Sequence, residues 1–286
     1  MNTALGIIGY PIGHSISPRF QQAALDGLSI NADYRAYEVH PDGVGDFVAS
    51  LRGPGVLGIN VTVPHKEAVM PFLDEIDDWA AEAGAVNTIV NRGGRLAGYN
   101  TDGYGFLRAL RESGGLEPAG KRGLILGAGG SARGVVQALL RAGIAELVIA
   151  NRTVARAQSL AELATERNVV AEAIPLEGGP LGDAAAAADL IVNCTSLGMR
   201  HGPDESATPL GARQIPAAAL VYDLVYNPMQ TPLLRAAEQA GASTLGGISM
   251  LVYQGAASFE IWLERPAPVA VMMDAAMAAM QEAISQ

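Results

Sequence analysis

Apolar residues in the first third of the chain occur in short runs, and each run is followed by a longer amphipathic stretch. Short apolar runs predict buried strands, whereas apolar residues spaced three or four positions apart predict helices that cover them. The predicted strand and helix pairs are Gly6–Gly9 with Pro18–Leu28, Tyr34–Val39 with Gly43–Leu51, and Gly58–Val61 with Pro64–Phe72. This alternation of strand and helix predicts a sheet rich in parallel strands.

A second series of strands follows a predicted helix, Tyr104–Ser113, for which Thr101 is the expected N-cap. Two helical patterns then close the chain with no further strand to pair, and we expect them to pack back on the first domain. This order of strands and helices predicts an α/β protein of two domains. One domain comprises residues 1–102 and 248–286, and the other comprises residues 103–247. The elements predicted in this second series are strands Gly123–Leu126, Leu147–Ala150, Leu190–Asn193, Leu220–Asp223 and Ser243–Leu245, and helices Ser131–Ala142, Ile248–Leu263 and Val269–Ile284.

Charge and hydropathy narrow the classes of partner. Lys and Arg total 19 against 29 Asp and Glu, a net charge of −10, which opposes binding to a phosphate backbone. We therefore expect no nucleic-acid partner, and we expect any anionic ligand to be held by helix N-termini or a few placed cations. No membrane span or secretory signal is evident, so we expect a cytoplasmic protein. The single cysteine, Cys194, is expected to be a buried strand residue.

A glycine-rich segment, Gly127-Ala128-Gly129-Gly130-Ser131, follows a predicted strand and opens a predicted helix. That context favours a dinucleotide site over a chance match. Gly127 would permit the tight turn, Gly129 would let the backbone approach a pyrophosphate, and Ala132 would let the helix pack on the sheet. The alternative is a turn with a structural role alone.

The choice of dinucleotide depends on the next strand end, Asn151-Arg152-Thr153. NAD enzymes usually carry an acid there, which binds the ribose 2′-hydroxyl, and this sequence has none. Arg152 and Arg156 instead offer two guanidinium groups that suit a 2′-phosphate. The pattern predicts NADP as cofactor, unless both arginines are simply solvated surface residues.

Other polar residues follow strands of the first domain. Ser15 and Ser17 could donate to a carboxylate, although as isolated features they are better explained as a helix-capping pair. Lys66 lies just past a strand end, and Asp102 lies at the end of another element. Such a pair could transfer a proton, but from spacing alone a surface lysine and a capping aspartate are favoured.

Eight short motifs follow one another along the chain: Gly13-His14-Ser15-Ile16-Ser17-Pro18, Asn60-Val61-Thr62-Val63-Pro64-His65-Lys66, Gly84-Ala85-Val86-Asn87-Thr88, Asn100-Thr101-Asp102-Gly103, Gly127-Ala128-Gly129-Gly130, Asn151-Arg152-Thr153, Tyr226-Asn227-Pro228 and Gln254-Gly255-Ala256. In this order, and over about Gly6 to Trp262, they resemble the shikimate dehydrogenase family. The resemblance implies that residues 1–102 and the C-terminal helices form a substrate domain, and that residues 103–247 form a Rossmann-type NADP-binding domain.

The resemblance also assigns roles to residues. It implies that Lys66 and Asp102 are the catalytic pair and touch the substrate. Asp78 is a looser match on the cofactor side, and an ordinary helix cap is favoured for it. The remaining substrate residues implied are Ser15 and Ser17 for the carboxylate with Tyr226 nearby, and Thr62, Asn87 and Gln254 for ring hydroxyls. The cofactor residues implied are Gly127, Ala128, Gly129, Gly130, Ser131, Asn151, Arg152, Thr153 and Arg156, with Leu224 and Gly247 at the nicotinamide end.

The expected reaction is the NADP-dependent interconversion of 3-dehydroshikimate and shikimate, a step of chorismate and aromatic amino-acid biosynthesis. Lys66 would exchange a proton with the substrate oxygen, and Asp102 would orient the Lys66 ammonium and balance its charge. No metal is expected, since His14, His40, His65 and His201 show no ligand spacing. The alternatives are a quinate/shikimate dehydrogenase of broader specificity and a non-catalytic metabolite sensor. A homodimer is left open.

Overall fold

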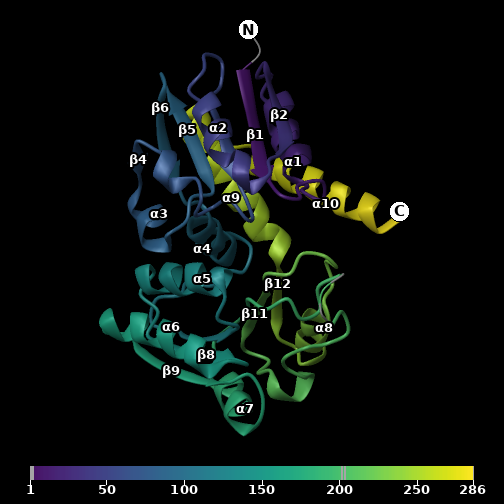
Figure 1. Ribbon diagram of the computed structural model, residues 1–286. Helices are drawn as coiled ribbons and strands as arrows, with labels where there is room; N and C mark the ends of the chain where they lie inside the picture. The colour runs from purple at the N-terminus through teal and green to yellow at the C-terminus, as the bar shows by residue number, and fades with distance from the viewer. Residues whose placement is uncertain (1–2, 201, 203, 286) are drawn as a thin grey trace. The chain divides into compact units, whose positions relative to one another are not determined.

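The computed structural model describes residues 3–200, 202 and 204–285, and the chain falls into two compact units. The first unit comprises Met1–Gly105 with Leu251–Gln286, and the second comprises Phe106–Met250. Both divisions lie inside helices, α4 (Asp102–Glu112) and α9 (Gly247–Leu263). The chain therefore passes between the units within continuous helices (Figure 1).

The first unit contains a mixed sheet with the strand order β2-β1-β3-β5-β6-β4. The pairs β1–β2, β1–β3 and β4–β6 are parallel, as the sequence predicts for the start of the chain. The pairs β3–β5 and β5–β6 are antiparallel, and the β5–β6 hairpin was not predicted. Its turn uses Gly93 and Gly94, both at positive φ, as tight hairpins require. The strands are β1 (Thr3–Gly9), β2 (Ala32–Glu38), β3 (Gly58–Val61), β4 (Glu75–Ile76), β5 (Thr88–Arg92) and β6 (Arg95–Tyr99).

Two local predictions for this unit are wrong. The stretch Pro64–Phe72 forms turns and a single 3-10 turn, η2 (Met70–Phe72), because Pro71 cannot donate within a helix. The cap of α3 is Asp77 rather than Asp78, since the Asp77 carboxylate accepts from the Ala80 N–H at 2.8 Å. The other helical segments are α1 (Ser17–Gly27), η1 (Pro41–Gly43), α2 (Val44–Ser50), α3 (Asp78–Ala83) and α10 (Val269–Ser285).

Strand β3 shows how the two faces of this sheet differ. Ile59 and Val61 lie in an apolar core with α2, while Asn60, between them, bonds to a side chain of α9 on the opposite face. The approach of α9 is close: a Cβ on Gly58 would lie 2.3 Å from Nε1 of Trp262. Helix α10 packs beside α1, so the C-terminal helices pack on the first unit as predicted (Figure 1).

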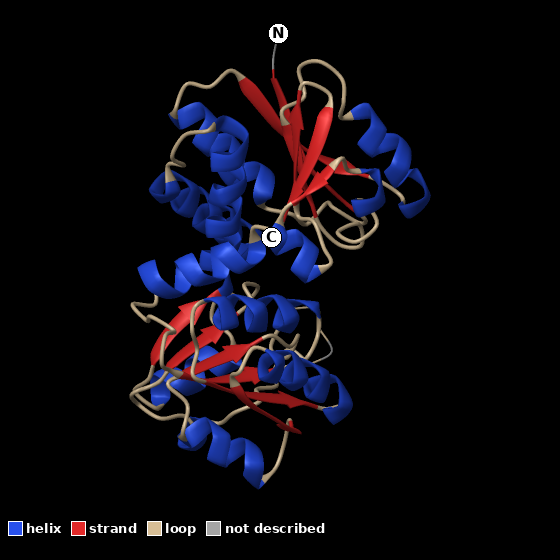
Figure 2. Cartoon of the chain, turned by 90° about the vertical axis from the view of Figure 1, so that its left-hand side faces the viewer, coloured by secondary structure: helices blue, strands red, loops and turns tan. Residues whose placement is uncertain are grey.

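The second unit is a parallel sheet with the order β12-β11-β10-β7-β8-β9. Because parallel crossovers are right-handed, strands added on opposite sides of β7 place their helices on opposite faces. Figure 2 shows helices on both faces of this sheet. The predicted strands are confirmed, whereas β9 and three helices were not predicted. The elements are β7 (Arg122–Leu126), α5 (Gly130–Arg141), β8 (Glu146–Asn151), α6 (Val154–Glu166), β9 (Val170–Pro175), α7 (Gly179–Ala186), β10 (Leu190–Asn193), η3 (Ala212–Gln214), β11 (Leu220–Asp223), α8 (Pro232–Gln239) and β12 (Ser243–Gly246).

The core between this sheet and helices α7 and α8 consists almost wholly of Leu, Ile, Val and Ala. Its members include Leu126 from β7, Ile191 from β10 and Leu233 from α8. A doubly wound parallel sheet of this kind confirms the predicted α/β fold class. Among the described residues, no helix is both long and apolar enough to cross a membrane.

Candidate active site

Lys66 and Asp102 meet in the first unit. Lys66 lies in the turn after β3, and Asp102 is the first residue of α4. The Lys66 Nζ lies 2.5 Å from Asp102 Oδ2, and the two side chains are 28% and 27% exposed. The pair is therefore held together and remains partly exposed to solvent.

Asn87 fixes the other oxygen of this carboxylate. Its Nδ2 donates to Asp102 Oδ1 at 2.8 Å, and its Oδ1 accepts from the backbone N–H of Thr101 at 2.9 Å. Because a backbone N–H can only donate, it must face the amide oxygen. The orientation of the buried Asn87 amide, with its NH₂ toward Asp102, follows from that bond.

Gln254 brings α9 to the same place. Its Oε1 accepts from Asn87 Nδ2 at 3.4 Å, and its Nε2 donates to the carbonyl of Leu251 at 2.8 Å. A Cβ on Gly105 of α4 would lie 2.5 Å from the Gln254 backbone nitrogen, so the helices can approach this closely only with glycine there. Residues far apart in sequence thus surround one Lys–Asp pair.

Thr62 directly follows β3, whereas Ser15 lies in the loop after the adjacent parallel strand β1 and Ser17 is the first residue of α1. The N-cap position of α1 is Ile16 and carries no side-chain cap bond, and Ser15 Oγ accepts only a long 3.3 Å bond from the Ser17 N–H. The helix-capping explanation of the two serines therefore has little support. Among the described residues, no hydrogen bond joins these three hydroxyls to the Lys66–Asp102 pair.

The glycine-rich turn of the second unit lies between β7 and α5. Gly127 has φ of 105°, and an added Cβ would meet Thr195 at 3.1 Å. At Gly129 and Gly130 an added Cβ would meet nothing within 4 Å. The first position tolerates only glycine for reasons internal to the fold, whereas the other two leave open space at the N-terminus of a twelve-residue helix. Ala128 belongs to the same turn, and the exposed Ser131 is the second residue of α5.

The arginines of the next strand end lie at the start of α6. Arg152 follows β8 directly, Thr153 is the N-cap residue, and Arg156 lies in the first turn. Asn151 holds this corner by donating to the Thr153 carbonyl at 2.9 Å. Both arginines are exposed, and no ion pair of either is seen in the part of the chain described. Two guanidinium groups and a helix N-terminus together favour an anion.

Sequence reasoning missed a buried carboxylate in this unit. Asp223, fully buried at the end of β11, accepts from Asn193 Nδ2 at 2.9 Å, the Val225 N–H at 3.0 Å and Thr231 Oγ1 at 2.6 Å. Burial raises the pKa of this carboxyl, and the three donors oppose that shift. Asn193 in turn accepts from Thr195, next to Gly127. The signal in sequence was an acid ending an apolar strand.

Of the residues predicted for the nicotinamide end, Leu224 lies in the loop after β11, and Gly247 follows β12 directly as the first residue of α9. A Cβ on Gly247 would lie 2.2 Å from the Leu224 carbonyl oxygen, so these two positions touch. Tyr226 is 37% exposed, and partial burial raises the pKa of its hydroxyl. Cys194 was expected to be a buried strand residue, but it lies directly after β10 and is half-buried. Desolvation and the nearby Asp223 charge raise the pKa of its thiol far above the usual value.

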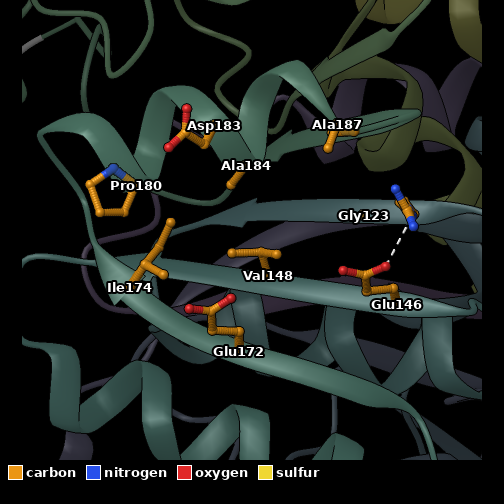
Figure 3. Close-up of a pocket in the computed structure, with 11 residues that line it drawn as sticks. Gly123, Glu146, Val148, Glu172, Ile174, Pro180, Asp183, Ala184 and Ala187 are labelled. Atoms are coloured by element: carbon orange, nitrogen blue, oxygen red, sulfur yellow. Dashed lines mark ion pairs between the residues drawn. The ribbon is translucent and has the colours of Figure 1, made fainter.

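A hollow in the second unit lies between helix α7 and strands β7, β8 and β9, toward the amino ends of β7 and β8 (Figure 3). Arg122 and Glu146, the first residues of β7 and β8, form a 2.9 Å ion pair in its wall, with Glu172 and Asp183 nearby. The glycine-rich turn follows the opposite end of β7. The hollow is therefore separate from the candidate cofactor residues.

No group of three or more His, Cys, Asp or Glu that could hold a metal occurs among the described residues. The buried His65 bonds through Nε2 to the Val39 carbonyl at 2.7 Å, and His40 packs edge-on against Tyr10. His201 lies outside the described residues.

Three family models match successive parts of the chain: the shikimate dehydrogenase substrate binding domain over residues 7–89, shikimate / quinate 5-dehydrogenase over residues 110–202, and the shikimate 5′-dehydrogenase C-terminal domain over residues 247–277. A curated relative, the shikimate dehydrogenase (NADP(+)) of Symbiobacterium thermophilum, is 49% identical over 97% of this chain and 94% of its own.

Solved structures agree. The shikimate 5-dehydrogenase of Thermus thermophilus, crystallised with NADP(H) and shikimate, has a TM-score of 0.84 at 37% identity and is matched over 99% of its length by 97% of this chain. A 5-ketofructose reductase from a Gluconobacter species has a TM-score of 0.88 at 34% identity, again over 97% of this chain and 99% of its own. On the sequence identity and the shared fold along nearly its whole length, the chain belongs to the shikimate dehydrogenase family.

Proposed function

We propose that the chain is an NADP-dependent oxidoreductase that interconverts 3-dehydroshikimate and shikimate. The observation that carries the proposal is the Lys66–Asp102 pair, partly open to solvent and held from behind by Asn87. An ammonium group held by a carboxylate can give a proton to an oxygen that becomes negative during reduction.

In the proposed reaction Lys66 Nζ donates a proton to the oxygen at C3 of the substrate as the ketone is reduced. When bound, NADPH supplies the hydride for this reduction. Asp102 keeps the ammonium in place and balances its charge. In the oxidation of shikimate the direction is reversed, and Lys66 accepts the hydroxyl proton.

The remaining polar groups of the first unit suit a hydroxylated ring acid. Ser15 and Ser17 offer neutral donors for the carboxylate. Tyr226, a residue of the second unit, keeps a protonated hydroxyl, and we assign it to substrate binding as well. Asn87, Thr62 and Gln254 offer amide and hydroxyl groups for ring hydroxyls. On this basis we assign substrate binding to residues 1–102 and 248–286.

The second unit fits NADP in three respects, and we assign residues 103–247 to its binding. Gly129 and Gly130 leave space for a pyrophosphate at the N-terminus of α5. Arg152 and Arg156 are exposed and suit a 2′-phosphate. The strand that precedes them ends in Asn151, so no acid is present there to bind a ribose 2′-hydroxyl. Leu224 and Gly247 are assigned to the nicotinamide end.

The direct test is a rate assay of the purified protein with shikimate or quinate and NADP or NAD, followed by the absorbance of the reduced nicotinamide. The expected result is turnover of shikimate with NADP at a kcat/KM well above the other three combinations. Comparable turnover of quinate would support the broader dehydrogenase. Binding of shikimate without turnover would support the metabolite sensor. Cytoplasmic location and a homodimer stay predictions, and size-exclusion chromatography with light scattering tests the latter.

A further inference from the structure

Behind Asn87 lies a chain of buried polar side chains to which no role has been given. Asn60 of β3 and Thr88 of β5 are direct partners in the antiparallel register, so both point to the face covered by α9. Ser258 of α9 and Tyr34 of β2 reach the same place. All four residues are buried, with Thr88 and Ser258 at 0% exposure. Polar groups in such a location cost free energy unless each is hydrogen-bonded.

The donors in this chain point in one direction. Tyr34 OH donates to Asn60 Oδ1 at 2.7 Å, and Asn60 Nδ2 donates to Thr88 Oγ1 at 3.1 Å and Ser258 Oγ at 2.9 Å. Thr88 Oγ1 lies 2.9 Å from Asn87 Oδ1, to which it donates, and 2.7 Å from Ser258 Oγ, where either hydroxyl can be the donor. The sequence of donors ends where Asn87 Nδ2 donates to Asp102.

The direction of donation is set by one group at each end of the chain. Burial raises the pKa of Tyr34 well above its usual value, so its hydroxyl keeps the proton and can act as the first donor. At the other end, the Thr101 N–H requires the oxygen of Asn87 to face away from Asp102. Hydrogen bonds aligned in this way polarise one another.

We propose that Tyr34, Asn60 and Thr88 are positioning residues, which act through Asn87 to hold the Asp102 carboxylate in the orientation that Lys66 requires. The proposal deepens the proposed function and rests on it for the identity of the reaction. Thr88 is the decisive member, because its hydroxyl bonds to the side-chain amide of Asn87, whereas Asn60 reaches only the Asn87 backbone carbonyl. None of the three touches the reacting atoms.

The first test compares Thr88→Val, which keeps the shape but removes the hydroxyl, with Thr88→Ser, which keeps the hydroxyl. We expect kcat for shikimate oxidation to fall about 10-fold to 100-fold in Thr88→Val. This is the range for residues that orient a functional side chain by a hydrogen bond, as known for the partners of metal ligands. We expect KM for NADP to stay unchanged and Thr88→Ser to restore most of kcat. Tyr34→Phe, at the far end, should show a smaller loss. Thr165→Val removes a hydroxyl that bonds only to a backbone carbonyl of α6, and should leave kcat unchanged.

The second readout does not depend on activity. In wild type, NMR should show slow exchange with solvent for the side-chain NH₂ protons of Asn87, and exchange should be faster in Thr88→Val and wild-type-like in Thr88→Ser. Equal kcat in wild type and Thr88→Val, or equal loss in Thr88→Val and Thr88→Ser, would overturn the proposal. Unchanged exchange of the Asn87 amide would overturn it as well. Wild type without shikimate turnover would refute the proposed function, while the exchange data would still decide whether Thr88 holds Asn87.

Discussion

The polar groups of the two units differ in what satisfies them. In the first unit, Asp102 receives bonds from Lys66 and Asn87, and Asn87 is itself held by Thr101 and Thr88. In the second unit, Arg152 and Arg156 project into solvent, and space is left beside Gly129 and Gly130. One region is complete without a ligand, whereas the other offers charge and room that a ligand would fill.

This difference indicates a division of labour. An acid/base group works best when its partners are fixed before the substrate arrives, because no reorganisation is then needed in the transition state. An anion site can remain solvated, since the ligand brings the charge that completes it. Substitutions at the Lys66–Asp102 pair and its partners should therefore lower kcat, and those at Arg152 and Arg156 should raise KM for the cofactor.

The largest expected effect is at Lys66. We expect Lys66→Ala to lower kcat by about 10²-fold to 10⁴-fold, the usual contribution of a positioned acid/base, with a much smaller change in substrate affinity. Lys121→Ala is the matched control, because Lys121 is the other of the two lysines in the sequence and its Nζ lies 3.9 Å from Asp189 in the second unit. Steady-state kinetics with shikimate measure both variants. Near-normal kcat in Lys66→Ala would remove this residue from proton transfer.

The arginines come next. Replacing both Arg152 and Arg156 by Ala should raise KM for NADP by one to several orders of magnitude, at roughly 1.5–3 kcal/mol for each charged contact, less a discount for solvent exposure. KM for NAD should barely change, because NAD has no 2′-phosphate. Arg235→Ala, another exposed arginine of the second unit, serves as control. Equal losses of kcat/KM with NAD and NADP would refute the assignment to the 2′-phosphate.

A comparable effect, on KM for the substrate rather than for the cofactor, is expected at the two serines. Ser15→Ala combined with Ser17→Ala should raise KM for shikimate, because two donors to an anion are lost, each worth roughly 1.5–3 kcal/mol. The melting temperature should change little, since α1 has no side-chain cap bond to lose. If the melting temperature falls and KM of the folded protein is unchanged, the serines serve the helix rather than the substrate.

The smallest effect concerns Cys194, near the glycine-rich turn. Because burial and the Asp223 charge raise the pKa of its thiol, little thiolate is present at neutral pH. We expect slow reaction with a thiol reagent in the native protein and fast reaction in denaturant. Thiolate, and so the native rate, increases only at pH values approaching the raised pKa. Rapid labelling of the native protein near neutral pH would show that this region is more open than the structure indicates.

Much of the fold could be predicted from local pattern, and the failures have physical causes. The βα repeats and the glycine-rich turn are local features, so apolar runs such as Leu190–Asn193 are enough to find them. The β5–β6 hairpin has short strands with weak alternation, and its pairing with β3 is a long-range contact. The helix predicted over Pro64–Phe72 does not form, because Pro71 lacks the N–H that a helix needs there, even though the apolar residues have helical spacing.

The site divides in the same way. Arg152 and Arg156 could be identified from the strand end alone, whereas Lys66 and Asp102 needed the family resemblance, because only the folded sheet brings them together. The hydrogen-bonded side chains that hold Asn87 could not be predicted from the sequence. Asn60, between Ile59 and Val61, had given a signal: a polar residue in a buried strand requires a polar partner on the opposite face.

The central claim, that chemistry and cofactor affinity reside in separate groups, is tested most directly by calorimetric titration of NADP into Lys66→Ala and into the Arg152→Ala, Arg156→Ala double variant. The account predicts a wild-type dissociation constant for Lys66→Ala and at least about a tenfold increase for the double variant, equivalent to roughly 1.4 kcal/mol. An equal increase in both proteins, or an increase only in Lys66→Ala, would contradict it.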